Sequence, residues 1–315
     1  MTATNSKDQE YRPVSLDWWE ALGRVLSSIE AVRDGQAWYL LIATFSATGL
    51  TTAVAQASIG RGETAWAVLQ GAAAAFLAFY GSNAVGILMM DRALKRPERD
   101  AVDAIWDALG IGHRVFLALA LVLVCAAAVI GILLGLFWLC SLPVIGPWLY
   151  ALVVPLTVVV LGLLMLTGVV MVGPMIGPMV WAGASSWQCL KLLWLFMRTH
   201  LLPVAVLMGG LTLITAILGA GVTLVVFAAG RLMAEASVVL VGVDVPPELL
   251  MAGLFGHGLH SVNLALVPKS ALPHTMAALV GGGVVFSLAL VMPSLVYLRG
   301  VCEIYLSLME RRSSR

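Results

Sequence analysis

The chain has 315 residues, of which 61% are hydrophobic and 11% charged, with a formal net charge of +1 and a mean hydropathy of +0.98. Soluble domains are about 45–50% apolar and about 25% charged, so this composition excludes a soluble globular fold and intrinsic disorder. It predicts an integral membrane protein. The first 35 residues are charged and contain no apolar stretch of the kind a signal peptide needs, so the first apolar run is expected to remain as a membrane anchor.

Six apolar runs follow one another along the chain, each long enough for a spanning helix of about 20 residues. They cover residues 37–59, 64–90, 114–139, 148–181, 201–230 and 275–300. Continuous runs of this length, rather than alternating segments of about ten residues, favour helices over a β-barrel. We therefore predict an all-α polytopic membrane protein with six transmembrane helices. The fourth run is too long for one straight span, so Pro174 and Pro178 are expected to bend it.

Lysine and arginine are distributed very unevenly between the loops. Fifteen of the eighteen lie before the first run, after the second or fourth run, or at and beyond the end of the last. The positive-inside rule makes these segments cytoplasmic, together with both termini. The expected organisation begins with a cytoplasmic N-terminal segment with an amphipathic helix (1–35), followed by a six-span membrane domain (36–308). That domain includes an extracytoplasmic segment (231–273), and a basic cytoplasmic tail follows it (309–315).

An amphipathic stretch that begins with a helix-capping residue precedes the first, third and fifth runs. The capping residues are Asp17, Asp100 and Ser185. An acid or amide three positions later could complete a capping box in each stretch, namely Glu20, Asp103 and Gln188. This pattern predicts three cytoplasmic elbow helices in the headgroup plane and three repeats over 15–90, 98–181 and 184–308. Alternatively, any helix that starts after a cytoplasmic loop would produce a similar pattern.

The elbow regions also carry a family resemblance. Three motifs carry it. The first joins residues 90–97 and 103–106, the second joins residues 173–178, 185–190 and 198–203, and the third is the closing stretch 296–306. The chain resembles a group of six-span bacterial inner-membrane proteins that includes the membrane domain attached to some glycerophosphodiester phosphodiesterases and related planctomycete-type hypothetical proteins. The resemblance implies a bacterial inner-membrane location. Relatives often carry an acid just before the third elbow, where this chain has residues 182–184, so a role for that acid does not transfer. No phosphodiesterase domain is present, and that activity is not implied.

Three histidines are the candidate metal ligands: His257, His260 and His274. His257 and His260 are three residues apart, so on a helix they would share a face and could begin a zinc or copper site. The alternative is a pair of interfacial histidines without metal, and because a third ligand would have to fold in, we assign no metal site.

The stretch 247–264 begins with proline and an acid, which predicts an amphipathic helix that rests on the outer face, contacts a partner or covers a lateral opening.

Residues 92–99 form a basic cluster beside the second run. Its Arg92, Lys95, Arg96 and Arg99 could contact anionic lipid headgroups, although the orientation rule alone also produces such clusters. Within the first two runs the polar residues are hydroxyls and amides, and they include Ser46, Thr48, Thr51, Thr52, Gln56, Ser82 and Asn83. These are expected to pack helices together. No acid or base lies near the centre of a run, which argues against ion-coupled transport.

These patterns predict a non-enzymatic structural, assembly or envelope component of the inner membrane. No phosphate-binding loop, serine nucleophile elbow or zinc-protease motif occurs in the sequence, so we expect no catalytic residues and no cofactor. Two alternatives remain: a passive channel or permease for a lipid or small molecule, and a membrane-embedded enzyme that acts on lipid. The expected partners are the lipid bilayer and a membrane protein or further copies of this chain, and no feature supports binding of nucleic acid.

Overall fold

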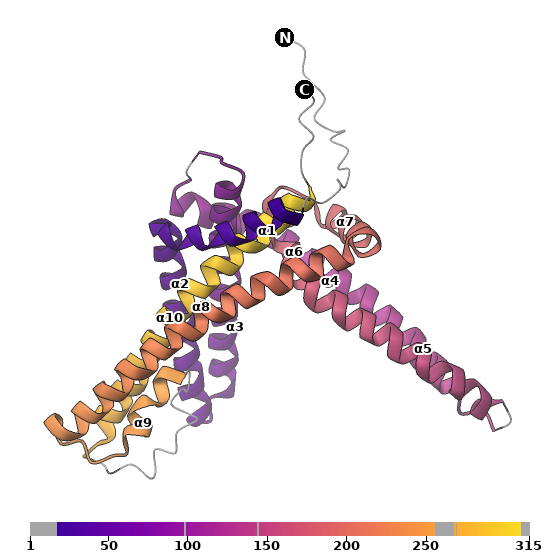
Figure 1. The fold of residues 1–315 in the computed structure, drawn as a ribbon. Helices are drawn as coiled ribbons and strands as arrows, with labels where there is room; N and C mark the ends of the chain where they lie inside the picture. The colour runs from indigo at the N-terminus through magenta and orange to yellow at the C-terminus, as the bar shows by residue number, and fades with distance from the viewer. Residues whose placement is uncertain (1–17, 98, 144, 256–267, 269, 310–315) are drawn as a thin grey trace. The chain divides into compact units, whose positions relative to one another are not determined.

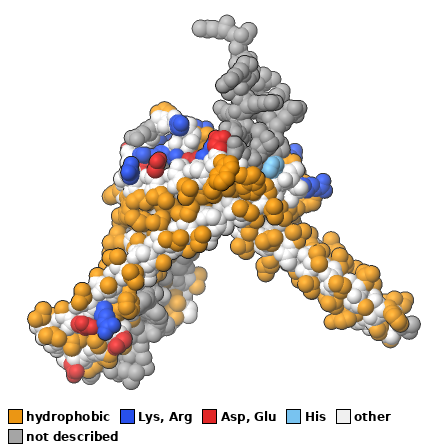
Figure 2. All heavy atoms as spheres, in the orientation of Figure 1, with side chains coloured by type: hydrophobic (Ala, Val, Ile, Leu, Met, Phe, Trp, Pro, Cys, Tyr) orange, Lys and Arg blue, Asp and Glu red, His pale blue; other side chains and the backbone are white. Residues whose placement is uncertain are grey.

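The computed structural model describes residues 18–97, 99–143, 145–255, 268 and 270–309. These residues form helices, turns and bends, with no strand among them (Figure 1). Within this described part, six helical segments are long and apolar enough to cross a membrane: Gly35–Gly60, Thr64–Ala93, Ala101–Leu139, Gly146–Trp181, Leu201–Val241 and Leu272–Leu308. Each contains one predicted run, so the all-α polytopic fold is confirmed. Hydrophobic side chains dominate the visible surface of the long helices, as lipid contact requires (Figure 2).

The last two spanning helices extend beyond the predicted runs. Helix α8 (Leu201–Ala236) continues past residue 230 into a π-helical segment, η3 (Ser237–Val241), and α10 (Leu272–Leu308) continues past residue 300. Charged residues ended the runs in the sequence, but they do not end the helices. Arg231 Nε lies 2.9 Å from Glu235 Oε1 on successive turns of the extended α8, a spacing that supports a helix.

One compact unit consists of Ser28–Leu109 and Thr212–Arg299. In it, α2 (Gly35–Gly60) and α3 (Thr64–Ala93) form a hairpin whose turn contains Gly62 at φ 79°. A hydrogen bond of 3.0 Å from the Glu63 amide to the Ser58 carbonyl closes this turn. The two helices approach so closely at Gly81 that a Cβ atom there would collide with the Thr44 side chain. A small residue therefore sets the spacing of the pair.

The other compact unit consists of Gly110–Leu211 with the described residues before Ser28 and after Arg299. It contains most of α4 (Ala101–Leu139), followed by α5 (Gly146–Thr167), α6 (Gly173–Trp181) and α7 (Ser186–Thr199). The first turns of α8 and the last turns of α10 also belong to it. The two units do not coincide with the three expected repeats, which remain a prediction.

The fourth span changes its helix type near the two prolines. Between α5 and α6 lies a π-helical segment, η2 (Gly168–Val172), and the amide of Gly173 bonds back to the Gly168 carbonyl. Pro174 comes directly afterwards. A proline has no amide hydrogen and its ring clashes with the carbonyl four residues earlier, so a wider turn before it relieves the misfit. The bend at the two prolines stays a prediction, and the structure shows a change of helix type that begins six residues before Pro174 as a π turn.

The three expected elbows differ in the structure. The first is α1 (Trp18–Ser27), followed by a 3-10 turn, η1 (Ser28–Arg33), and the third is α7. The second stretch is no separate helix, because α4 runs without a break from Ala101 into the third span. The predicted capping box is confirmed at Ser185 and Gln188, whereas the Asp100 side chain accepts from the adjacent amide of Ala101, at 2.8 Å, and the Asp100 carbonyl accepts from the Ala104 amide, at 3.0 Å. Asp17 lies outside the described residues.

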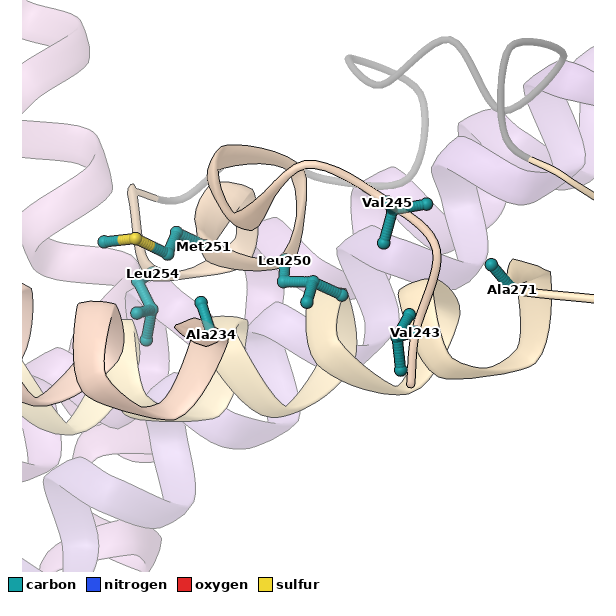
Figure 3. Close-up of a cluster of buried hydrophobic side chains, with 7 residues drawn as sticks. All are labelled: Ala234, Val243, Val245, Leu250, Met251, Leu254 and Ala271. Atoms are coloured by element: carbon teal, nitrogen blue, oxygen red, sulfur yellow. The ribbon is translucent and has the colours of Figure 1, made fainter. Parts of the chain in front are cut away.

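Part of the predicted amphipathic stretch 247–264 forms a cap over neighbouring helix ends. Helix α9 (Pro247–Met251) begins at the proline and runs into a 3-10 turn, η4 (Ala252–Phe255). Its apolar side chains point toward α8 and the start of α10 and form one buried cluster with them (Figure 3). The residues in that cluster are Ala234, Val243, Val245, Leu250, Met251, Leu254 and Ala271. Residues 256–264 lie outside the described part, so the predicted length of the helix is not tested.

Candidate functional site

A groove between α2 and α10 is the main candidate site. It belongs wholly to the unit that contains α2 and α3, has a volume of about 350 Å³, and extends from Phe45 to Gln56 on α2 and from Leu279 to Leu290 on α10. Leu50 and Val280 in its wall are 54% and 47% exposed, so the groove opens onto the outer surface of the helices. We call it the α2–α10 groove.

The length of the α2–α10 groove matches one leaflet of a bilayer. From Phe45 to Gln56 an α-helix rises about 16 Å, at 1.5 Å per residue. The hydrocarbon core of a bilayer is about 30 Å thick, so one leaflet contributes about 15 Å. Gln56 lies four residues before the end of α2 at Gly60, and Phe45 lies in the body of the helix. The groove therefore reaches from near a membrane surface to about the midplane.

Neutral polar groups line the otherwise apolar groove. They are the side chains of Ser46, Thr48, Thr52, Gln56 and Ser287, and no lining residue is ionisable. Thr52 and Ser287 donate their hydroxyl hydrogens to carbonyls of their own helices, at 2.8 and 2.9 Å. Thr48 Oγ1 is buried and has no hydrogen-bond partner among the described residues. An unsatisfied buried hydroxyl costs about 1–3 kcal/mol, which a ligand with a polar atom at this position would recover.

The groove is suited to binding rather than to chemistry. Its apolar walls can take a hydrocarbon chain, and its hydroxyls and amide can hydrogen bond to ester, hydroxyl or amide groups of the same molecule. Acid–base and nucleophilic catalysis both use a group with a tuned pKa or an adjacent base, and the lining residues supply neither. The site therefore fits an uncharged segment of an amphiphile.

The sequence analysis identified most of these polar residues, but it could not show that they lie together in one groove. It treated the hydroxyls and amides of α2 as helix-packing groups, and Thr51 fits that interpretation because its hydroxyl donates to the Ala47 carbonyl at 2.7 Å, away from the groove. Ser287 was not singled out. The signal that could have identified it is its position one helical turn after Gly283, on the same side of α10 as a glycine that leaves a gap there.

The basic residues 92–99 form an ionic cluster with acids instead of standing free. Arg92 Nε lies 2.6 Å from Asp34 Oδ2, and Arg96 Nη1 lies 3.2 Å from Asp91 Oδ1. Arg99 Nε lies 3.1 Å from Asp91 Oδ2, and its Nη1 pairs with Asp107. The carboxylates of Asp34 and Asp91 are 2% and 6% exposed. This ionic cluster ties the starts of α2 and α4 to the end of α3.

These pairings bear on the predicted headgroup contacts. Three of the four candidate cations, Arg92, Arg96 and Arg99, already face carboxylates, and Lys95 occupies a left-handed turn position at φ 52°. The Arg96 amide donates to the Asp91 carbonyl at 2.9 Å, which is the hydrogen-bond pattern of a Schellman helix end. Headgroup contact by residues 92–99 remains a prediction, and among them it would depend most directly on the exposed Lys95.

The other candidate residues are not gathered into a site. His257 and His260 lie outside the described residues, and His274 is exposed at the start of α10. Within the described residues, no group of three His, Cys, Asp or Glu side chains could hold a metal ion. Cys189 is buried on α7, and its burial raises the pKa of the thiol to about 11. That thiol is therefore a packing group at neutral pH.

Comparison of the chain with protein-family models, with curated proteins and with solved structures finds no match. The resemblance to the membrane domains attached to glycerophosphodiester phosphodiesterases therefore remains a prediction. Function is inferred from the α2–α10 groove and the residues that line it.

Proposed function

We propose that the protein is a non-enzymatic, multi-pass component of a bacterial inner membrane that binds a membrane lipid in the α2–α10 groove. The proposal includes cytoplasmic termini, as the distribution of Lys and Arg favours. The observation that carries the proposed binding is an apolar groove of leaflet length whose polar lining residue nearest the membrane surface is Gln56. Lipid tails are the most abundant apolar chains at that depth, and their ester groups lie near the membrane surface.

The dimensions of the groove support retention of a lipid more than its passage. A permease needs a path through both leaflets, whereas the lining residues follow α2 and α10 for only about 16 Å. A lipid held in this way could fix the packing of α2 against α10, which suits a structural or assembly role. Passive lipid transfer is the second candidate and is tested by the same purified protein.

A pair of glycines on α10 provides a matched test of the groove. A Cβ atom at Gly283, which lines the groove, and one at Gly281, which does not, both meet no atom within 4 Å. Both positions therefore have room for the first side-chain carbon, so Gly283→Leu should extend into the groove, and Gly281→Leu should change helix propensity by the same amount without filling it. Native mass spectrometry of protein purified from membranes should show one retained phospholipid in the wild type and in Gly281→Leu, and at least a tenfold lower retained fraction in Gly283→Leu.

Gln56→Leu tests the hydrogen bond separately from the space. It replaces the amide at the level of the lipid ester groups by an apolar side chain of similar size, so it should weaken lipid retention by about fivefold or more. Thr51→Val is the control, because the Thr51 hydroxyl already bonds to Ala47 and lies outside the groove. Equal retention by all four variants would refute lipid binding at the groove. Lipid flux above that of empty vesicles would support a permease instead of a structural component.

A further inference from the structure

Helix α7 lies at the membrane surface because it connects two spans almost directly. The fourth spanning segment ends at Trp181, α7 covers Ser186–Thr199, and the fifth begins at Leu201. Only a short turn with the Ser185 cap precedes α7, and only His200 follows it. A helix joined so tightly to the ends of two spans cannot leave the headgroup region.

The two faces of α7 have different compositions. Cys189, Leu193 and Phe196 are buried against the protein. On the opposite side lies a stripe of four residues spaced by four, three and four positions, which places them on one face of the helix: Trp187, Lys191, Trp194 and Arg198. Trp187 and Trp194 are 57% and 53% exposed. We call these four residues the α7 stripe.

Each cation of the α7 stripe lies over a tryptophan ring. Lys191 Nζ is 5.9 Å from the ring centroid of Trp187, and Arg198 Cζ is 4.5 Å from that of Trp194. Tryptophan prefers the membrane interface, and a guanidinium stacked on its ring still presents N–H groups at its edge. The pairs therefore hold two positive charges at headgroup depth, with N–H donors at their edges that can bind an anion.

No carboxylate neutralises the α7 stripe in the described part of the chain. The sequence has no Asp or Glu between Asp107 and Glu235, and none of the ion pairs among the described residues involves Lys191 or Arg198. A further exposed cation, Arg114, has its backbone beside the start of α7, where the Ser186 hydroxyl donates to the Arg114 carbonyl at 3.0 Å. This contrasts with residues 92–99, whose arginines face acids.

We infer that the α7 stripe binds the phosphate groups of anionic phospholipids in the leaflet where α7 lies. The stripe supplies two cations that pair with no carboxylate among the described residues, and two interfacial aromatic rings at the depth of those phosphates. Cationic side chains near a membrane surface attract anionic lipid. This inference is independent of lipid binding in the α2–α10 groove, because the two sites have different residues and different ligand groups.

The full-length protein should be reconstituted into nanodiscs of equal parts phosphatidylcholine and phosphatidylglycerol. Electron paramagnetic resonance of trace spin-labelled lipids then gives the relative association constants of the two headgroups. We expect the wild type to prefer phosphatidylglycerol and the double variant Lys191→Gln/Arg198→Gln to lose at least fivefold of that preference, since each surface cation contributes about fivefold. The charge-retaining variant Lys191→Arg/Arg198→Lys should keep it, and raised salt should weaken it in the wild type.

Two controls make the outcome decisive. Arg24→Gln removes a cation of α1 that already pairs with Glu20, so it should leave the headgroup preference unchanged. Gly283→Leu should also leave it unchanged, which separates this result from the groove. The inference is overturned if the wild type shows no preference for phosphatidylglycerol, or if the preference survives in Lys191→Gln/Arg198→Gln. Because both substituted side chains are exposed, the double variant is expected to fold.

Discussion

Asp34 connects the start of the first span to the end of the second. It caps α2 by accepting a hydrogen bond of 3.2 Å from the Ala37 amide, and its other oxygen lies 2.6 Å from Arg92 Nε. Its carboxylate is buried although it stands at a helix end. Substitution of Asp34 should therefore destabilise the protein through two separable effects, the loss of the cap and the loss of the ion pair.

The magnitudes follow from the exposure of the two partners. Loss of a side-chain cap costs about 1 kcal/mol. Breaking a fully buried ion pair costs about 3–5 kcal/mol, but exposed pairs contribute at most about 1 kcal/mol, and Arg92 is 40% exposed. We therefore expect Asp34→Asn, which retains the capping oxygen, to lower the free energy of unfolding by about 1–2 kcal/mol. Asp34→Ala should lower it by about 2–3 kcal/mol.

Titration with sodium dodecyl sulfate in mixed micelles, followed by far-UV circular dichroism, measures these changes. The double variant Asp34→Asn/Arg92→Gln should cost less than the sum of its two single variants, because either substitution alone already breaks the pair. Glu20→Gln is the control, since Glu20 forms an exposed pair with Arg24 and should change stability by less than about 0.5 kcal/mol. Strict additivity, or an Asp34→Asn variant as stable as the wild type, would refute the reasoning.

Three further predictions concern the helix ends and the packing. Gly81→Ala places a methyl group against buried Thr44 and should cost about 1–3 kcal/mol, with partial recovery in Gly81→Ala/Thr44→Ala, measured by the same titration. Lys95→Gly relieves a left-handed backbone position and should raise stability by about 0.5–1 kcal/mol; a loss of stability would show that the Lys95 side chain matters more than its backbone. The buried Cys189 thiol, whose pKa is raised to about 11, should resist alkylation at pH 8 in the folded protein and react once it is unfolded; rapid labelling of the folded protein would contradict its burial.

The spans could be predicted from the sequence because length and apolarity alone specify them. All six runs lie on long helices, and the Ser185–Gln188 capping box is where the local pattern placed it. The ends of α8 and α10 were missed because charged residues such as Arg231 and Glu303 mark the end of an apolar run but do not end a helix. Glu303 is only 7% exposed in α10.

The candidate site depended on contacts that no local pattern contains. The α2–α10 groove forms where residues more than two hundred positions apart face each other, so Ser287 could not be grouped with Thr48 before the helices were placed. The same holds for the ionic cluster, in which Asp34 and Arg92 belong to different helices. Local charge counting grouped Arg92, Arg96 and Arg99 as a basic cluster, and it could not show the acids that face them, which come partly from the start of α2 and from α4.

Photocrosslinking with a phospholipid that carries a diazirine in its acyl chain tests lipid binding in the α2–α10 groove most directly. The purified protein in nanodiscs would be irradiated and the labelled peptides identified by mass spectrometry. We predict that labels concentrate on residues 45–56 and 279–290, and that Gly283→Leu lowers labelling there while Gly281→Leu does not. Labels spread evenly over exposed apolar helices such as α4, α5 and α8, with no effect of Gly283→Leu, would contradict a lipid site in the groove.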